Sequence, residues 1–205
     1  MATLTWGEDN RYVYGIDRGV LHGQDSDEMY AWNGLTAVSV DEVNTPELVS
    51  SFDGKTYANL IFRGFYEAEV SALSFPYEAM SLNGEVEALP GFIFTAQEKE
   101  LYDFSYRTFE NDEDYKIHFV WNAIFVQKAK SRRTLSDNLD AIEFKWKVSA
   151  VPELMPYWYP ASSLIVDSKL TDPDVLSSLE DLLYGTDITD PTFPSQLDVL
   201  LEYIV

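Results

Sequence analysis

The sequence predicts a mainly β protein, a β-sandwich or barrel with a flanking α-helix. Apolar and polar residues alternate with a period of two along most of the chain, which is typical of strands with one buried face. One segment near the carboxyl end has the spacing of an amphipathic helix. The 205 residues, 46% of them hydrophobic and 15% aromatic, are enough to bury a sizeable core. We therefore expect a single domain over residues 1–205, with a C-terminal helical segment at about 172–205.

Three long segments carry the alternation, at residues 65–73, 115–126 and 141–149. In the first, Glu67 and Glu69 share a polar face, and Ala68 and Val70 share the opposite, apolar face. In the second, every odd-numbered residue from Tyr115 to Phe125 is apolar, which predicts one long core strand. In the third, aromatic residues alternate with lysines, which predicts another amphipathic strand.

Shorter strands are expected at residues 30–40, 56–62, 101–109 and 163–166. Asp53-Gly54 and Asn83-Gly84 have the residue types of tight turns. Residues 127–140 begin with several basic side chains and continue with polar ones, so we expect a long exposed loop there.

The helix is predicted from residue 173 onward. Asp172 suits the N-cap, Pro173 the first helical position, and Gly185 the stop. Five apolar residues form the stripe that should pack on a sheet: Val175, Leu176, Leu179, Leu182 and Leu183. Beyond it, Ser195 could cap a second short helix, although a strand is also compatible with the pattern.

Net charge restricts the possible partners. The formal charge is −21, and only 14 of the residues are basic. Such an acidic surface disfavours binding to nucleic-acid phosphates and to anionic lipid, because both depend on cationic side chains. The sequence contains no cysteine. It also lacks an apolar run long enough to cross a bilayer and lacks a secretory pattern in its first twenty residues. We expect no membrane association.

The sequence predicts no catalytic, cofactor-binding or metal-binding residues and no cofactor. It has two histidines, His22 and His118, and none of the nucleophile, phosphate-loop or zinc motifs. The acidic run at 111–114 lacks the ligand spacing of a calcium loop and is interpreted as a hairpin tip. Glu67 and Glu69 could form a carboxylate pair for glycoside chemistry, and Tyr157-Trp158-Tyr159 could stack on sugars. Packing is the favoured interpretation of the aromatic cluster.

Seven local strings resemble the major tail tube proteins of siphophages, the long-tailed bacteriophages. They follow the order of the family across most of the chain: YGIDRGVL (14–21), AWNGLTAVSV (31–40), FYEAEVSALSFPYE (65–78), LYDFSYRT (101–108), YKIHFVW (115–121), AIEFKWKV (141–148) and LEDLLYGT (179–186). No single string is as specific as a metal-ligand signature. The acids Asp25, Asp27 and Glu28 and the aromatic segment 157–159 depart from the family pattern.

The resemblance implies a tail-tube-like β-sandwich and a structural rather than enzymatic role. In such proteins, hexameric rings stack into a tube whose inner sheets close into a barrel, and the double-stranded genome passes through without sequence-specific binding. The implied partners are other copies of the chain, a tape-measure protein, and tail-terminating or tail-tip proteins. The implied location is the virion tail, with assembly in the host cytoplasm.

Several interpretations remain open at this stage. If the strand at 65–73 belongs to the inner sheet, Glu67 and Glu69 face the lumen; an outward-facing strand fits the alternation equally well. Another virion component of similar fold is an alternative function, such as a baseplate, decoration or gene-transfer-agent tail protein. A glycan-binding β-sandwich is a further alternative.

Overall fold

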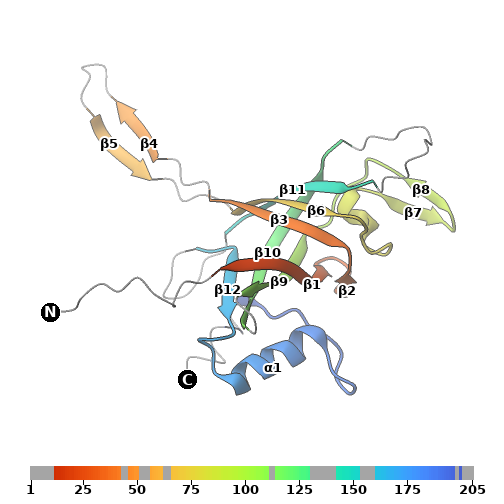
Figure 1. The fold of residues 1–205 in the computed structure, drawn as a ribbon. Helices are drawn as coiled ribbons and strands as arrows, with labels where there is room; N and C mark the ends of the chain where they lie inside the picture. The colour runs from red at the N-terminus through yellow and green to blue at the C-terminus, as the bar shows by residue number, and fades with distance from the viewer. Residues whose placement is uncertain are drawn as a thin grey trace, which may run out of the picture.

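Figure 1 presents a computed structural model of the chain, which describes residues 12–42, 46–50, 56–61, 66–110, 114–129, 142–152, 160–196 and 199. The described part is mainly β, and a 12-residue α-helix lies against the sheet. The predicted fold class is confirmed. Within this part, no helix has the length and apolar character needed to span a membrane.

Eight strands form one antiparallel sheet. Its order is β2-β1-β9-β10-β11-β6-β3, and β12 pairs with β10 on the edge that β11 also uses. The strands are β1 (Val13–Gly23), β2 (Glu28–Trp32), β3 (Leu35–Glu42), β6 (Tyr66–Ala72), β9 (Tyr102–Glu110), β10 (Asp114–Gln127), β11 (Phe144–Ala150) and β12 (Ser163–Asp167). The long β10 therefore holds the centre of the sheet.

The sheet curls until its two ends meet. Strands β2 and β3 stand at opposite ends of the strand order, yet only Asn33 and Gly34 separate them in sequence. Gly34 has a φ of +96°, which favours glycine at this corner. At Gly19 of β1, an added Cβ would lie 2.5 Å from a methyl carbon of Leu35, so glycine permits the close approach of β1 to the corner. The result is a sheet wrapped around an interior, as in a barrel or sandwich.

Aromatic side chains fill that interior. Trp32 of β2 and Trp146 of β11 meet edge to face, with ring centroids 5.3 Å apart, although β1, β9 and β10 stand between their strands in the sheet order. Phe104 and Phe125 complete the centre at 5.8 Å from one another. Both indole N–H groups donate hydrogen bonds, from Trp32 to the Ser74 carbonyl and from Trp146 to the Asn83 side-chain oxygen. These two indole rings are thereby buried with their N–H donors paired.

Helix α1 (Pro173–Tyr184) has the predicted boundaries. The Asp172 side chain accepts a hydrogen bond from the backbone N–H of Asp174, and Gly185 ends the helix with a φ of +73°. Leu176, Leu179 and Leu183 are buried, and Val175 and Leu182 are half-buried. The buried leucines join a second apolar cluster on the outer side of the sheet, together with Val20, Ile117, Phe119, Trp121, Phe193 and Val199.

Strand β10 serves both apolar clusters. The register of the β9–β10 pairing shifts between Val120 and Ala123, and Asn122 lies in the left-handed region with a φ of +53°. Before this bulge, Phe119 and Trp121 belong to the cluster under α1, and after it, Ala123 and Phe125 belong to the interior. The prediction of one long core strand is confirmed by β10, but its odd-numbered apolar residues do not share one face, because a bulge adds a residue and reverses the alternation.

Other differences from the expected strands have local causes. The segment expected as one strand at 30–40 is two strands, separated by the Asn33-Gly34 corner. The alternation did not indicate β1, nor β4 (Pro46–Ser50), which pairs with β5 (Thr56–Ile61), nor β7 (Val86–Leu89), which pairs with β8 (Phe92–Phe94). The turn predicted at Asn83-Gly84 ends the 3₁₀-helix η1 (Met80–Asn83). Asp53-Gly54 and the aromatic cluster 157–159 lie outside the described residues, as does most of the C-terminal segment after 196.

The packing of α1 leads to a stability prediction. Leu179→Asp should lower the free energy of unfolding by roughly 3 to 5 kcal/mol, because it removes a buried leucine and leaves a carboxylate unpaired in an apolar cluster. Ser177→Asp, at an exposed position on the same helix, is the matched control. Urea unfolding of both variants measures the difference, and equal midpoints would contradict the packing.

Candidate functional site

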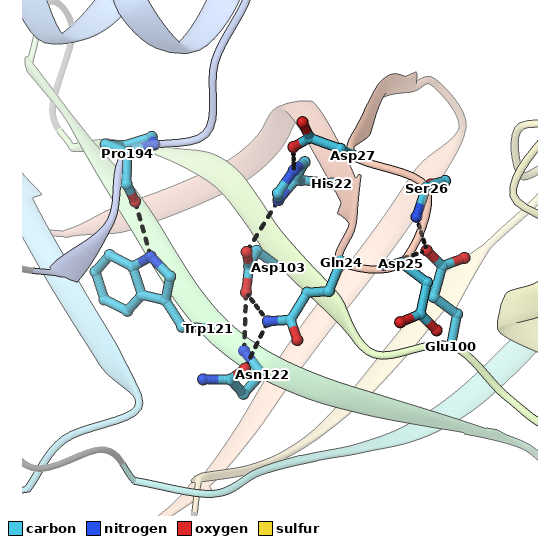
Figure 2. Close-up of polar contacts among 10 residues, drawn as sticks. All are labelled: His22, Gln24, Asp25, Ser26, Asp27, Glu100, Asp103, Trp121, Asn122 and Pro194. Atoms are coloured by element: carbon cyan, nitrogen blue, oxygen red, sulfur yellow. Dashed lines mark hydrogen bonds and ion pairs between the residues drawn. The ribbon is translucent and has the colours of Figure 1, made fainter.

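A polar network surrounds the bulge in β10 (Figure 2). Its centre is Asp103 of β9, whose residue is 7% exposed. One carboxylate oxygen lies 3.0 Å from His22 Nδ1. The other accepts hydrogen bonds from the Gln24 side-chain amide and the Asn122 backbone N–H, each at 2.9 Å. Asp103 thus satisfies a backbone donor that the bulge removes from the strand ladder.

The same network joins three strands to the C-terminal segment. His22 lies on β1, and its Nε2 is 3.1 Å from a carboxylate oxygen of Asp27. The His22 ring stacks on Phe193 with centroids 5.8 Å apart. Next to it, the Trp121 indole N–H donates to the Pro194 carbonyl at 2.9 Å. The histidine therefore contacts two carboxylates and an aromatic ring, which is the environment of a structural group that fixes neighbouring elements.

Glu100 fixes the turn between β1 and β2. One carboxylate oxygen accepts the backbone N–H groups of Asp25 and Ser26, both at 2.9 Å, and the other accepts the Ser81 hydroxyl at 2.9 Å. Partial burial opposes ionisation, but these hydrogen bonds outweigh it and lower the pKa of Glu100. Glu100 thus orders the turn that carries the acidic residues Asp25 and Asp27.

A polar layer lies at one end of the interior, where β9 and β10 pair. Lys116 forms an ion pair with Glu110 at 2.9 Å, and Glu110 is 2% exposed. His118 stacks on Tyr106 with centroids 4.5 Å apart and contacts the Thr108 hydroxyl at 2.9 Å. Burial, followed by the nearby charge of Lys116, lowers the pKa of His118 to about 4. Among the described residues, no group of three or more His, Cys, Asp or Glu is arranged to hold a metal ion.

Glu67 and Glu69 lie on the outer face of β6, away from the aromatic interior. The Glu67 carboxylate is 3.0 Å from Lys147 of β11, and the Glu69 carboxylate forms an ion pair with Lys128 just after β10. Glu143 pairs with Lys145 at 3.0 Å on the same face. The glutamates do not form an isolated carboxylate pair, since each has its own lysine. The face formed by β3, β6 and β11 therefore carries both positive and negative side chains, arranged in ion pairs.

Electrostatics agree with this pairing. The hydrogen bond from Lys128 is the main cause that lowers the pKa of Glu69. Lys145 likewise lowers the pKa of Glu143, and Glu143 raises the pKa of Lys145. All these side chains are solvent-accessible, so the pairs set the charge pattern of the face rather than its stability.

The charged face and the helix lie on different sides of the curled sheet. In Figure 1, β11, β6 and β3 run along the top of the sheet and α1 lies below it. The ribbon of β4 and β5 projects from one end, and the ribbon of β7 and β8 from the other. In β7 and β8, large apolar side chains are exposed, among them Leu89, Phe92 and Phe94 at 63%, 68% and 63%.

The sequence pattern did not indicate the network around Asp103. His22 and Asp103 are 81 residues apart, and the register of β1 with β9 brings them together. The one available signal was an aspartate between two aromatic residues, Tyr102 and Phe104. Such a position predicts that the carboxylate is paired, but it does not identify the partner.

Comparisons with known proteins give no family. No protein-family model matches the chain, and no curated protein matches its sequence. Among solved structures, the chain is similar to the PVC sheath/tube terminator of an extracellular contractile injection system, determined by cryo-EM in the extended state. The identity is 13%, the match covers 76% of this chain and 97% of that chain, and the TM-score is 0.38. A TM-score at this level establishes neither a shared fold nor a shared function.

The buried imidazole predicts a pH dependence. The unfolded chain binds a proton at His118 near pH 6.5, whereas the folded protein binds it only near pH 4. Between these values the unfolded state carries more protons, so falling pH should remove stability, by about 3 kcal/mol at most. Urea unfolding from pH 7 to pH 4 should show this loss in the parent relative to His118→Gln. Parallel stability curves for the two proteins would contradict it.

Proposed function

We propose that this chain is a structural protein of a phage-like tail, which assembles into stacked hexameric rings that form the tail tube. In this role it is not an enzyme and needs no cofactor. Its partners are other copies of itself, a tape-measure protein, and tail-terminating or tail-tip proteins. It resides in the virion tail after assembly in the host cytoplasm. Double-stranded DNA passes through the tube without sequence-specific binding.

The observation that carries the proposal is the two-sided construction of the curled sheet. One outer side is covered by α1 through an apolar cluster, and the other side, formed by β3, β6 and β11, is polar and bare of any other described element. A tube subunit needs two such sides, because its inner wall contacts water and DNA and its outer wall is built on protein. The ribbons β4–β5 and β7–β8 are separate two-stranded sheets that project from the main sheet. Such a ribbon is only marginally stable alone, so contacts with other copies would stabilise it.

The charges of the bare face are compatible with a lumen. Glu67 and Glu69 alone would make a negative band, but their partners Lys147 and Lys128 neutralise it locally. Phosphates passing such a wall meet no excess of cations, and cations are what would hold DNA through counterion release. We therefore place Glu67 and Glu69 on the lumen side in this proposal, as members of ion pairs rather than as free acids.

Electron microscopy of the purified chain tests the function. At high protein concentration the tail-tube role predicts hollow cylinders or stacked rings of uniform diameter. Single rings that never stack would favour a different tail component. A protein that remains monomeric at every concentration would contradict the proposal.

Charge reversal tests the lumen side. Glu67→Lys together with Glu69→Lys should leave folding largely intact, since both side chains are on the surface. The change replaces two ion pairs by four neighbouring lysines, which should hold DNA at low salt and release it as salt rises. Tubes assembled with a fluorescent duplex should then protect the duplex from nuclease.

The matched control reverses the same amount of charge elsewhere. Asp187→Lys together with Asp190→Lys changes two exposed acids in the loop after α1. These tubes should bind duplex on the outside and leave it open to nuclease. Equal nuclease digestion for both variants would mean that Glu67 and Glu69 do not line the lumen.

A further inference from the structure

The strongest unassigned feature is the free-standing ribbon of β7 and β8, residues 86–94. It forms a two-stranded sheet of its own, with Val86 opposite Phe94 and Leu89 opposite Phe92. Phe92 and Phe94 are two residues apart on one strand and so share a face, and their partners share it with them. These four apolar side chains, the ribbon face, are between 44% and 68% exposed.

An apolar face of this kind needs a partner. A lone two-stranded ribbon is only marginally stable in water, and contiguous exposed apolar patches mark interaction sites. Four large side chains exposed to this extent offer roughly 400 Å² of apolar surface. This is about half of the ~800 Å² that each partner contributes to a standard interface. The ribbon face has the size of an interface core and requires a polar rim from the surrounding residues.

A second exposed aromatic surface lies at the start of β1. The rings of Tyr12, Tyr14 and Phe109 stack in series, with centroids 5.9 and 5.8 Å apart, and form an aromatic ladder. Tyr12 is 57% exposed and Tyr14 is 46% exposed. In Figure 1 the start of β1 and the β7–β8 ribbon lie at opposite sides of the molecule, so one copy cannot join its own two surfaces.

The two surfaces differ in charge. On and near the ribbon, Glu78, Glu87 and Glu98 are exposed acids, and Lys99 already donates to the Phe125 carbonyl. Behind the aromatic ladder, the Arg107 guanidinium lies 5.2 Å above the Phe109 ring and is paired with Asp17, and Arg18 is paired with Glu180, so these charges cancel locally. A locally neutral aromatic surface accepts the acidic ribbon more readily than a second ribbon does, because ribbon against ribbon would bring acids together.

We infer that the ribbon face of one copy docks on the aromatic ladder of the next copy, in a head-to-tail contact. Two different surfaces on opposite ends of one subunit make a heterologous interface, which closes into a ring or continues as a stack. This inference rests on the proposed function, and it names the surfaces through which the copies associate. Aromatic side chains on both partners then supply the core of the contact.

The absence of cysteine from the sequence allows a direct test by cross-linking. Leu89→Cys lies within the ribbon face, and Tyr12→Cys lies at the end of the aromatic ladder; both positions are exposed. A short bismaleimide should link the two variants when they are mixed and should link neither variant to itself. Self-linking of Leu89→Cys would mean ribbon-to-ribbon association and would overturn the inference, as would an unlinked mixture.

Substitution within the contact gives the second measurement. Phe92→Ser together with Phe94→Ser should weaken association at least tenfold in sedimentation equilibrium, with an unchanged melting temperature. Leu170→Ser together with Ile188→Ser is the matched control, because these side chains are 75% and 93% exposed outside both surfaces. If the parent assembles and the ribbon variant assembles equally well, the inference fails and the proposed function stands. A parent that neither assembles nor cross-links removes both.

Discussion

The hydrogen bond from the Asn122 backbone N–H to Asp103 stabilises the bulge in β10. At this bulge the apolar side chains of β10 stop facing one apolar cluster and begin to face the other. Without a bulge, the alternation of β10 would direct Ala123 and Phe125 toward the same side as Phe119. The bulge costs a ladder hydrogen bond and places Asn122 at a positive φ. A buried carboxylate on the neighbouring strand compensates, because it accepts the freed donor and is itself held by His22 and Gln24. The helix-covered side and the aromatic interior both depend on this local arrangement.

The bulge also explains why the C-terminal segment returns to the sheet where it does. Trp121, turned outward by the register shift, donates its indole N–H to Pro194, and Phe193 packs on both His22 and Phe119. The apolar cluster under α1 is thus closed by residues from both ends of the chain. Among the described residues, this closure leaves β3, β6 and β11 uncovered, so their two-sided arrangement depends on one shift in register.

The sequence was sufficient for elements that depend on local chemistry and insufficient for those that depend on pairing. Asp172 and Pro173 act on the backbone at the first turn of the helix and Gly185 acts at its end, and α1 has the boundaries that they indicate. The alternation at Glu67 and Glu69 correctly separates a wet face from a packed face. Their partners Lys147, on β11, and Lys128, just after β10, are brought alongside only by the sheet order. A bulge has no pattern of its own, because β10 reads as one unbroken apolar alternation across it. The Asn33-Gly34 corner was a readable signal that the long alternation around it concealed.

Electrostatic repulsion and apolar attraction between copies act over different distances, and the proposed assembly depends on this difference. A net charge of −21 keeps free copies apart beyond contact distance, although at physiological salt this repulsion decays over about 8 Å. Apolar association acts only when the surfaces touch and exclude water. Misaligned copies therefore meet mostly acid against acid, whereas a copy whose ribbon face reaches an aromatic ladder gains contact where arginines already offset the acids. The repulsion acts at longer range than the apolar attraction, so copies associate only in the one orientation that brings these surfaces into contact. A chain with an exposed apolar ribbon can therefore remain dispersed until two copies meet in that orientation.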